Sequence, residues 1–265
     1  MIPNILSIAG SDPSGGAGIQ ADIKSISANG GYAMAAITAL TAQNTRGVVA
    51  VQLMDPGIVT AQIAAIRADI RIDAVKIGML GNAAIVRAVA EALCGVEAPV
   101  VLDPVMVAKG GDRLLAAEAV DALRRLLIPM AALITPNLPE AADLLGVPEA
   151  RSRDDMLAQA RQLGALGARA VLMKGGHLGG QASPDLLMHE AGALWLEGSR
   201  IDSPNTHGTG CTLSSAIAAH LGAGVALAEA VYLSKAYITG AIAGASLLDV
   251  GHGHGPTHHF YTARR

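Results

Sequence analysis

Short apolar runs alternate along the chain with longer segments in which apolar residues recur at helical spacing. The short runs predict β-strands at residues 4–9, 48–53, 73–78, 99–103, 131–135 and 169–175. The longer segments predict helices at residues 19–29, 57–70, 82–93, 116–127, 139–145 and 153–166. This alternation is typical of βαβ units. Because several strands are apolar throughout, we expect an α/β fold with a mostly parallel sheet and helices on both faces.

The last third of the chain follows a different pattern. The runs DLLMH (185–189) and GALWLEG (192–198) predict a β-hairpin. Residues 208–244 are rich in small side chains and predict two helices, which we expect to close one end of the sheet. The chain contains no internal repeat and no low-complexity linker, so its 265 residues are predicted to form a single domain, 1–265.

Composition narrows the class of protein. Hydrophobic residues make up 51% of the chain and charged residues 15%, which predicts a large core and argues against disorder. With 2% aromatic residues and a net charge of −3, the chain lacks the features of a nucleic-acid-binding protein. The absence of long apolar runs and of a cationic leader predicts a cytoplasmic protein with no membrane partner. Cys94 and Cys211 are expected to be reduced thiols.

Polar residues after the predicted strands are the first candidates for a site, since ligands of parallel α/β folds bind at the carboxyl ends of the strands. The first strand is followed by GSDPSGGAGIQAD (10–22), within which residues 16–21 fit the dinucleotide pattern G-x-G-x-x-[GA]. No acidic residue that could hold a ribose occurs between Asp22 and Asp55, which disfavours a dehydrogenase. The glycines either allow a tight turn or, with Asp22, approach a small substrate.

Later strand ends carry charged and amide side chains. Asn137 and Glu140 stand three residues apart at a predicted helix start, where they form either a hydrated Mg²⁺ site or a helix cap. Asp103 ends the strand PVVLD, and a carboxylate in that position needs a cationic partner or a metal. Lys174, in VLMKGGH, is either a phosphate ligand or a surface lysine. No Walker loop is present, so any phosphate is bound in another way.

The motif HGTGC (207–211) combines glycines with a helix start. The backbone N–H groups of Gly208, Thr209 and Gly210 can converge on an anion, where the helix dipole adds positive potential. At such a position the pKa of the Cys211 thiol is predicted to fall below its free value of about 8.5. The alternative is that Cys211 only packs, which we expect of Cys94, because Cys94 has neither glycines nor a cation nearby.

The C-terminal segment GHGHGPTHHF (251–260) contains four of the eight histidines. Its spacing could suit zinc, but the chain offers no pair of thiols in matching positions and no H-E-x-x-H motif. We therefore expect this segment to pack beside the site without binding a metal.

Taken in order, the motifs identify a resemblance. GSDPSGGAGIQAD, ALTAQNT, KIGML, VLDPVM, ITPNLPEA, VLMKGGH, NTHGTGC and GHGHGP are similar to those of the hydroxymethylpyrimidine/phosphomethylpyrimidine kinase family of thiamine biosynthesis, within the ribokinase-like superfamily. The resemblance runs from about residue 4 to residue 260. It implies a three-layer sandwich, a homodimer, and the use of ATP and Mg²⁺ to phosphorylate 4-amino-5-hydroxymethyl-2-methylpyrimidine first to its monophosphate and then to the diphosphate.

The same resemblance implies roles for individual residues. The pyrimidine is expected to contact Gln43, Asp22, Ala17, Met79 and Met106. The nucleotide phosphates are expected to meet Asn137, Lys174, Thr209 and the glycines Gly208 and Gly210, with Asp103 and Glu140 organising Mg²⁺. Cys211 takes the place of the catalytic base of sugar kinases and is expected to accept the hydroxymethyl proton.

Other functions stay open at this point. A vitamin B6 kinase would share the fold, and a non-catalytic pyrimidine-binding protein would keep the pocket without turnover; a dehydrogenase is a third and weaker possibility. Glycine-rich stretches at 109–111 and 175–180 are candidates for a mobile flap over the site.

Overall fold

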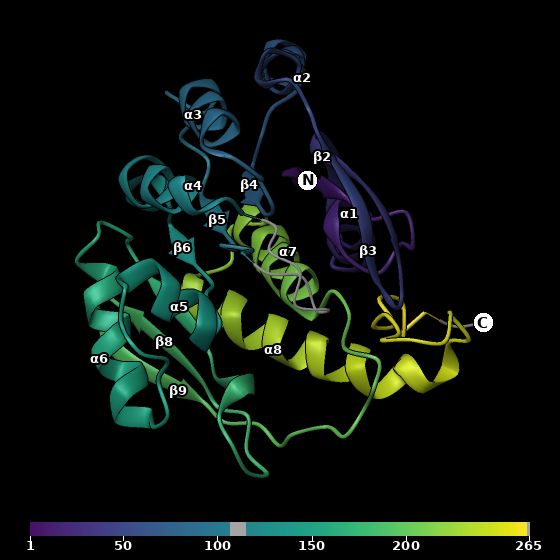
Figure 1. Ribbon diagram of the computed structural model, residues 1–265, viewed down its shortest axis with the longest axis vertical. Helices are drawn as coiled ribbons and strands as arrows, with labels where there is room; N and C mark the ends of the chain where they lie inside the picture. The colour runs from purple at the N-terminus through teal and green to yellow at the C-terminus, as the bar shows by residue number, and fades with distance from the viewer. Residues whose placement is uncertain (107–114, 264–265) are drawn as a thin grey trace.

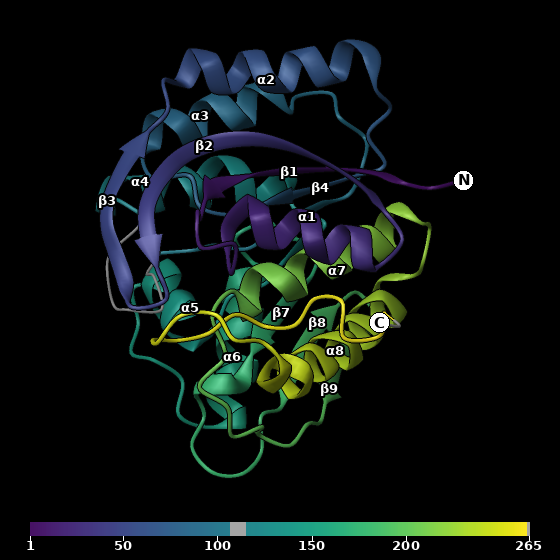
Figure 2. The same ribbon diagram turned by 90° about the vertical axis from the view of Figure 1, so that its right-hand side faces the viewer.

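The computed structural model describes residues 1–106 and 115–263 (Figures 1 and 2). Within them, nine strands form one sheet in the order β3-β2-β1-β4-β5-β6-β7-β8-β9. The strands are β1 (Asn4–Ser11), β2 (Tyr32–Asn44), β3 (Gly47–Leu53), β4 (Ala74–Ile77), β5 (Val100–Leu102), β6 (Leu133–Ile134), β7 (Val171–Lys174), β8 (Asp185–His189) and β9 (Gly192–Leu196). The pairs from β2 through β7 are parallel, whereas β3, β8 and β9 pair antiparallel. The candidate flap at 109–111 lies outside the described residues.

Helices cover both faces of the sheet, which confirms the predicted three-layer α/β architecture (Figure 1). One face carries α1 (Gly18–Ala28), α7 (Thr209–Gly222) and α8 (Leu227–Ala243). The other carries α2 (Pro56–Asp69), α3 (Ala83–Ala92), α4 (Ala117–Ala122), α5 (Leu138–Leu145) and α6 (Arg153–Gly164). The pair α7 and α8 therefore covers a face of the sheet, and the expectation that it closes an end was wrong.

Period-two alternation explains why the central strands are apolar throughout. In β1, Ile5 points to the α1/α7/α8 face, whereas Leu6 and Ile8 point to the opposite face. In β5, Val101 and Leu102 divide between the faces in the same way. Because both faces are covered by helices, neither set of side chains is left to water.

Strand β2 is the element that the sequence pattern missed. Its sequence, YAMAAITALTAQN, is rich in alanine, which has no local preference for a strand. Pairing with β1 on one side and with β3 on the other imposes the extended conformation. The consequence for function is direct, because β2 carries Gln43 to the edge of the site.

Among the residues that the structure describes, no helix is both long enough and apolar enough to cross a bilayer.

Candidate active site

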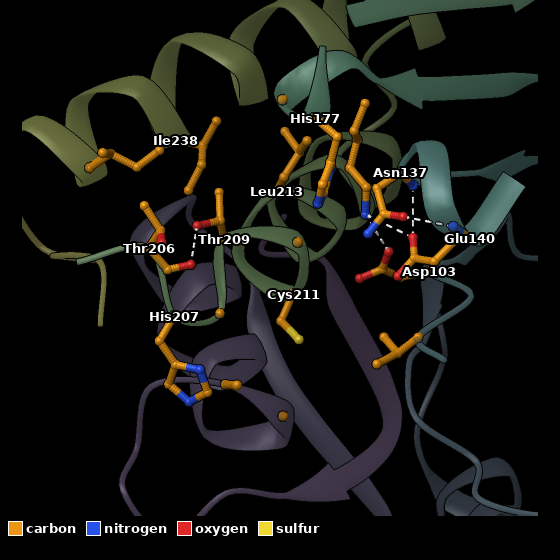
Figure 3. A pocket seen from close by; sticks show the side chains of 18 of the residues that line it. Asp103, Asn137, Glu140, His177, Thr206, His207, Thr209, Cys211, Leu213 and Ile238 are labelled. Carbon is orange, nitrogen blue, oxygen red and sulfur yellow. Dashed lines mark hydrogen bonds and ion pairs between the residues drawn. The ribbon is translucent and has the colours of Figure 1, made fainter. Parts of the chain in front are cut away.

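A cavity of about 690 Å³ opens at the carboxyl ends of the parallel strands (Figure 3). Residues following β1, β4, β5, β6 and β7 line it, together with the first turn of α7 and one side of α8. Of the residues predicted from the sequence to form the site, those that line the cavity are Ala17, Gln43, Met79, Asp103, Met106, Asn137, Glu140, Lys174, Gly208, Thr209, Gly210 and Cys211. The fold thus brings together side chains that are spread over most of the chain.

Lys174 stands between two buried carboxylates on one side of the cavity. Its Nζ lies 2.9 Å from Asp103 Oδ1 and 3.6 Å from Glu140 Oε2. Burial by itself would raise the pKa of Asp103, but the neighbouring Lys174 and Lys76 outweigh it and hold that pKa below its ordinary value. Burial opposes the charge of Lys174 as well, yet the two carboxylates raise its pKa. Lys174 is therefore a cation positioned inside the cavity, not a free surface lysine.

Asn137 and Glu140 form the helix cap that was one of the two interpretations of their spacing. Asn137 Oδ1 accepts the Glu140 N–H at 2.8 Å, and Glu140 Oε2 accepts the Asn137 N–H at 2.7 Å. Both residues also line the cavity, so capping and ligand binding are compatible here. Burial raises the pKa of Glu140 to about 7, and the nearby Asp103 adds to this effect against the opposing charge of Lys174.

The donors around Lys174 suit a hard cation. Asp103 and Glu140 supply carboxylate oxygens, and Asn137 adds an amide, which are ligands that Mg²⁺ accepts. Within residues 1–106 and 115–263, no group of three or more His, Cys, Asp and Glu side chains forms a ready-made metal site. A Mg²⁺ ion here would thus draw most of its ligands from phosphates and water. The same finding, made on the described residues, gives no support to zinc binding by the histidines of the tail.

The start of α7 is shaped by a close approach between two glycine segments. Gly208 has a positive φ of 74°, and a Cβ at this position would lie 1.8 Å from the carbonyl oxygen of Gly16. Thr209 Oγ1 donates to the Thr206 carbonyl at 2.6 Å. N–H groups in the first turn of a helix have no carbonyl of a preceding helical turn to bond, and the Thr209 N–H makes only a long contact, 3.4 Å, to the Thr206 carbonyl, so this turn can receive an anion at the edge of the cavity.

Cys211 lies in this first turn with its sulfur directed toward the middle of the site (Figure 3). The prediction of a lowered thiol pKa was wrong, because burial raises the pKa of Cys211 to about 11. Lys76 and a hydrogen bond from the Gly18 N–H favour the thiolate, but the carboxylates of Asp22 and Asp103 oppose it. At neutral pH Cys211 is therefore a protonated thiol.

The opposite end of the cavity has an apolar wall and one amide. Met79 and Met106 are buried, with 8% and 1% of their surfaces exposed, and both border the cavity with Ala17. The Gln43 amide reaches the same space from the end of β2 and lies 3.4 Å from His207 Nε2. Thioether side chains beside an amide are a lining suited to a flat ring with a polar edge.

Asp22 does not reach the cavity, contrary to the prediction that it contacts the substrate. It is fully buried, and Lys76 Nζ contacts its two carboxylate oxygens at 2.8 and 2.9 Å. Ser7 and Ser215 donate to the same carboxylate at 2.6 and 2.8 Å. These donors occupy the carboxylate, so Asp22 joins β1, β4 and α7 beneath the site.

Sequence reasoning also missed Lys76, which lies buried beneath the site, and Asp12 and His207, which line the cavity. Lys76 is a charge inside an apolar strand, which is an available signal for a buried ion pair. Asp12 and His207 lie in the motifs GSDP and HGTGC, and His207 Nε2 lies 2.7 Å from Asp12 Oδ2. Nothing in the sequence pairs these two residues, which are 195 positions apart.

The second flap candidate, residues 175–180, lies along the cavity beside β7. Arg200 donates to the carbonyl oxygens of Gly176, Leu178 and Gly180, at 2.9, 2.5 and 3.0 Å. Asp185 Oδ1 also accepts the Gly175 N–H at 2.9 Å. In this structure the segment is thus fastened at both of its ends.

Comparison with known proteins gives consistent results. A family model described as phosphomethylpyrimidine kinase matches residues 12–258. The chain is 53% identical over 259 residues to the hydroxymethylpyrimidine/phosphomethylpyrimidine kinase of Escherichia coli, covering 97% of both chains. It is 48% identical to the thiamine biosynthesis bifunctional protein ThiED of Geobacter sulfurreducens, covering 98% of this chain and 53% of that protein. Among solved structures, an ADP complex of Bacillus subtilis pyridoxal kinase is similar, with a TM-score of 0.91, 40% identity and 99% coverage of both chains.

Proposed function

The chain belongs to the phosphomethylpyrimidine kinase family, and from this we propose that it phosphorylates 4-amino-5-hydroxymethyl-2-methylpyrimidine twice at the expense of ATP. The first transfer goes to the hydroxymethyl oxygen and the second to the phosphate that results. The observation that carries this proposal is the position of Lys174 and the first turn of α7 in one cavity, which also has an apolar end lined by Met79 and Met106.

The nucleotide is placed in the part of the cavity formed by α5, the end of β7 and α8. Lys174 and the N–H groups of Gly208, Thr209 and Gly210 are suited to phosphate oxygens, and the Asn137 amide lies at the same side. Leu213 and Ile238 offer an apolar surface for a purine (Figure 3). The related pyridoxal kinase, whose structure is an ADP complex, supports an adenine nucleotide as the donor.

Asp103 and Glu140 are the residues that would hold Mg²⁺. When bound, Mg²⁺ supplies charge that balances the phosphate oxygens during transfer. Glu140 favours such a cation when ionised, and its pKa of about 7 makes that ionisation depend on pH in the physiological range. Lys174, which contacts both carboxylates, is held where its ammonium can meet the transferring phosphoryl group.

Cys211 is the candidate acceptor of the hydroxymethyl proton. Only the thiolate of Cys211, a small fraction at neutral pH, can accept this proton and become the thiol. Phosphoryl transfer depends more on positioning and charge stabilisation than on early removal of a proton, so a small thiolate fraction is compatible with a late proton transfer. In the second phosphorylation the nucleophile is an ionised phosphate, and no base is required. The two steps therefore differ in their need for Cys211.

The direct test is to incubate the purified chain with ATP, Mg²⁺ and 4-amino-5-hydroxymethyl-2-methylpyrimidine and to follow products by mass spectrometry. We expect the monophosphate to appear first and the diphosphate to follow. Binding of the pyrimidine without turnover of ATP would favour a non-catalytic binding protein, and the absence of both products would overturn the proposal.

Pyridoxal is a second candidate substrate, because a pyridoxal kinase shares this fold at 40% identity. A comparison of kcat/KM for the aminopyrimidine and for pyridoxal on the same preparation separates the two activities. We expect the aminopyrimidine to be preferred by at least about tenfold, the range that a few pocket contacts provide.

A homodimer working in the cytoplasm is the assembly that we propose. Strand β3 is an edge of the sheet, and its Val49 and Val51 are 81% and 41% exposed. Apolar edge strands are normally covered, and a second copy is a suitable cover. Light scattering should give twice the chain mass of 26.8 kDa, and the chain mass itself would contradict the proposal. Cell fractionation tests the location.

A further inference from the structure

A chain of polar contacts runs along the pyrimidine end of the cavity. His207 Nε2 lies 2.7 Å from Asp12 Oδ2 and 3.4 Å from the amide nitrogen of Gln43. The amide oxygen of Gln43 lies 3.1 Å from Thr41 Oγ1. Gln43 thus lies between His207 and Thr41. The position of the proton on each neighbour decides whether the oxygen or the nitrogen of the Gln43 amide faces it.

Asp12 fixes the proton on His207. Asp12 Oδ1 accepts the N–H and the hydroxyl of Ser14 at 2.9 and 2.7 Å, and Oδ2 accepts the Ala17 N–H at 2.8 Å. Burial would raise the pKa of Asp12, but the hydrogen bonds from His207 and Ser14 outweigh it and lower that pKa. Asp12 is therefore an ionised acceptor, so His207 Nε2 must carry a proton and donate it.

Ser11 fixes the proton on Thr41. A threonine hydroxyl has one proton, and Thr41 Oγ1 has two acceptors within reach, the Ser11 carbonyl oxygen at 2.8 Å and Gln43 Oε1 at 3.1 Å; the shorter contact, to Ser11, takes the proton. Toward Gln43, Thr41 Oγ1 can then only accept. On one side of Gln43, the protonated Nε2 of His207 donates to Asp12 and has no lone pair with which to accept, and on the other side Thr41 offers an acceptor.

These two neighbours select one orientation of the Gln43 amide. With its nitrogen toward His207 and its oxygen toward Thr41, the amide would meet a donor with a donor and an acceptor with an acceptor. A half-turn of the amide group exchanges the two atoms, so that the Gln43 nitrogen donates to Thr41 Oγ1 and the Gln43 oxygen takes the longer, second share of the His207 N–H that Asp12 accepts. The consistent arrangement has the Gln43 oxygen on the His207 side and its nitrogen on the Thr41 side.

The C-terminal tail holds this arrangement in place. The backbone N–H of His207 donates to the Gly255 carbonyl at 3.0 Å, and the backbone N–H of Gly253 donates to Thr45 Oγ1 at 3.1 Å. A Cβ on Gly16 would lie 2.4 Å from the His207 ring, so the absence of a side chain there lets the ring seat against the loop. The glycine-rich segment that resembled a metal motif thus fastens the His207 loop and the β2–β3 hairpin together.

We propose that Asp12, His207 and Thr41 are positioning residues that lock the Gln43 amide in one orientation and so determine which ring edge the site accepts. The inference rests on the proposed function, because it assigns the substrate's edge. An aminopyrimidine carries an amino donor beside a ring nitrogen acceptor. The locked amide matches that pair with the amino group on the His207 side and the ring nitrogen on the Thr41 side, and a ring without the amino group forfeits its hydrogen bond to the Gln43 oxygen.

The test compares two substrates on variants of the locking residues. The substrates are 4-amino-5-hydroxymethyl-2-methylpyrimidine and its analogue without the 4-amino group. For His207→Leu we expect kcat/KM to fall about tenfold on the amino substrate, mainly through KM, and less than about threefold on the analogue, because a freely turning amide no longer discriminates. His207→Gln retains an N–H donor toward Asp12 and should restore most of the selectivity.

Thr41→Val removes the other anchor with little change in size and should lower selectivity in the same direction. Thr60→Val is the matched control, since the Thr60 hydroxyl donates to the Pro56 carbonyl on α2 and Thr60 does not line the cavity. An equal loss on both substrates in His207→Leu and Thr41→Val would overturn the inference. If the wild-type protein phosphorylates neither substrate, the proposed function itself fails, which distinguishes the two outcomes.

Discussion

At the scale of single residues, the protonation of Cys211 controls what this thiol can do. With a pKa raised to about 11 by burial, the thiolate fraction at neutral pH is small and grows tenfold for each unit of pH. If Cys211 accepts the hydroxymethyl proton, kcat/KM for the first phosphorylation should rise between pH 7 and pH 9. The second phosphorylation should lack this tenfold rise per unit of pH, because the ionisation of Glu140, which affects both steps, is already about half complete at pH 7 and adds only about a factor of two.

Replacing Cys211 by alanine tests the same role. We expect Cys211→Ala to slow the first phosphorylation by about a hundredfold, the usual contribution of a general base, and to change the second by less than about threefold. Single-turnover measurements that start from the alcohol and from the monophosphate give the two rates separately. Equal losses in both steps would rule out the assignment of Cys211 as a base.

The raised pKa of Glu140 predicts how the stability of the folded protein depends on pH. Because its pKa rises from 4.5 to about 7 on folding, the folded protein binds this proton more tightly than the unfolded chain. The resulting stabilisation is complete below about pH 4.5 and is lost as the pH rises through about 7. Glu140→Gln keeps an oxygen that can accept from Asn137 and cannot ionise, so its Tm without nucleotide should exceed that of the wild type at pH 8 but not at pH 5.

Thermal scans of the ligand-free proteins at pH 5, 6, 7 and 8 provide the measurement. Glu91→Gln, at an exposed position on α3, is the matched control and should follow the wild type across the series. A difference in Tm between Glu140→Gln and the wild type that does not change with pH would contradict the raised pKa of the buried Glu140 carboxyl.

At the scale of the element, the two ends of α7 offer a matched pair of glycines. Gly208 precedes the helix and Gly224 follows it, with positive φ angles of 74° and 83°. A Cβ on Gly224 would meet nothing within 4 Å, whereas one on Gly208 would lie 1.8 Å from the Gly16 carbonyl oxygen. We expect Gly224→Ala to cost about 1 kcal/mol of unfolding free energy and Gly208→Ala about 3 kcal/mol.

Urea unfolding at 25 °C measures both costs, and kinetic assays give the functional effect. Gly208→Ala should also raise the KM for ATP, because the segment around Gly16 and the N–H groups of the first turn of α7 must move apart. Gly224→Ala should leave that KM close to the wild-type value. Similar losses of stability and activity in the two variants would show that backbone conformation alone, and not the close approach to Gly16, matters at Gly208.

At the scale of the whole molecule, one continuous sheet joins the two edges of the structure. We therefore expect residues 1–265 to unfold as a single cooperative domain. Trp195, the one tryptophan in the sequence, lies in the edge strand β9, so its fluorescence reports on that edge while far-ultraviolet circular dichroism reports on all elements. The two thermal transitions should coincide, and ATP with the aminopyrimidine should shift both equally; separate transitions would indicate two domains.

Local pattern predicted the order of the strands and helices, apart from β2, and most of the residues that meet at the carboxyl ends of the strands. Asp103, Asn137 and Lys174 were found because apolar periodicity locates the strands, and parallel topology then brings their ends to one edge. Gln43 and Met79 were predicted as site residues only because the motifs that contain them resemble those of the family. These features depend on local pattern and on rules of chain topology, and both can be seen in a sequence.

The surroundings of each of these groups could be known only from the folded chain. Asp22 is removed from the cavity by Lys76, Ser7 and Ser215, and Cys211 is protonated because burial and two carboxylates outweigh the helix start. The contact between Asp12 and His207 joins positions 195 residues apart. Burial, charge and hydrogen bonding depend on what packs against a side chain, and distant segments supply those neighbours only once the chain has folded.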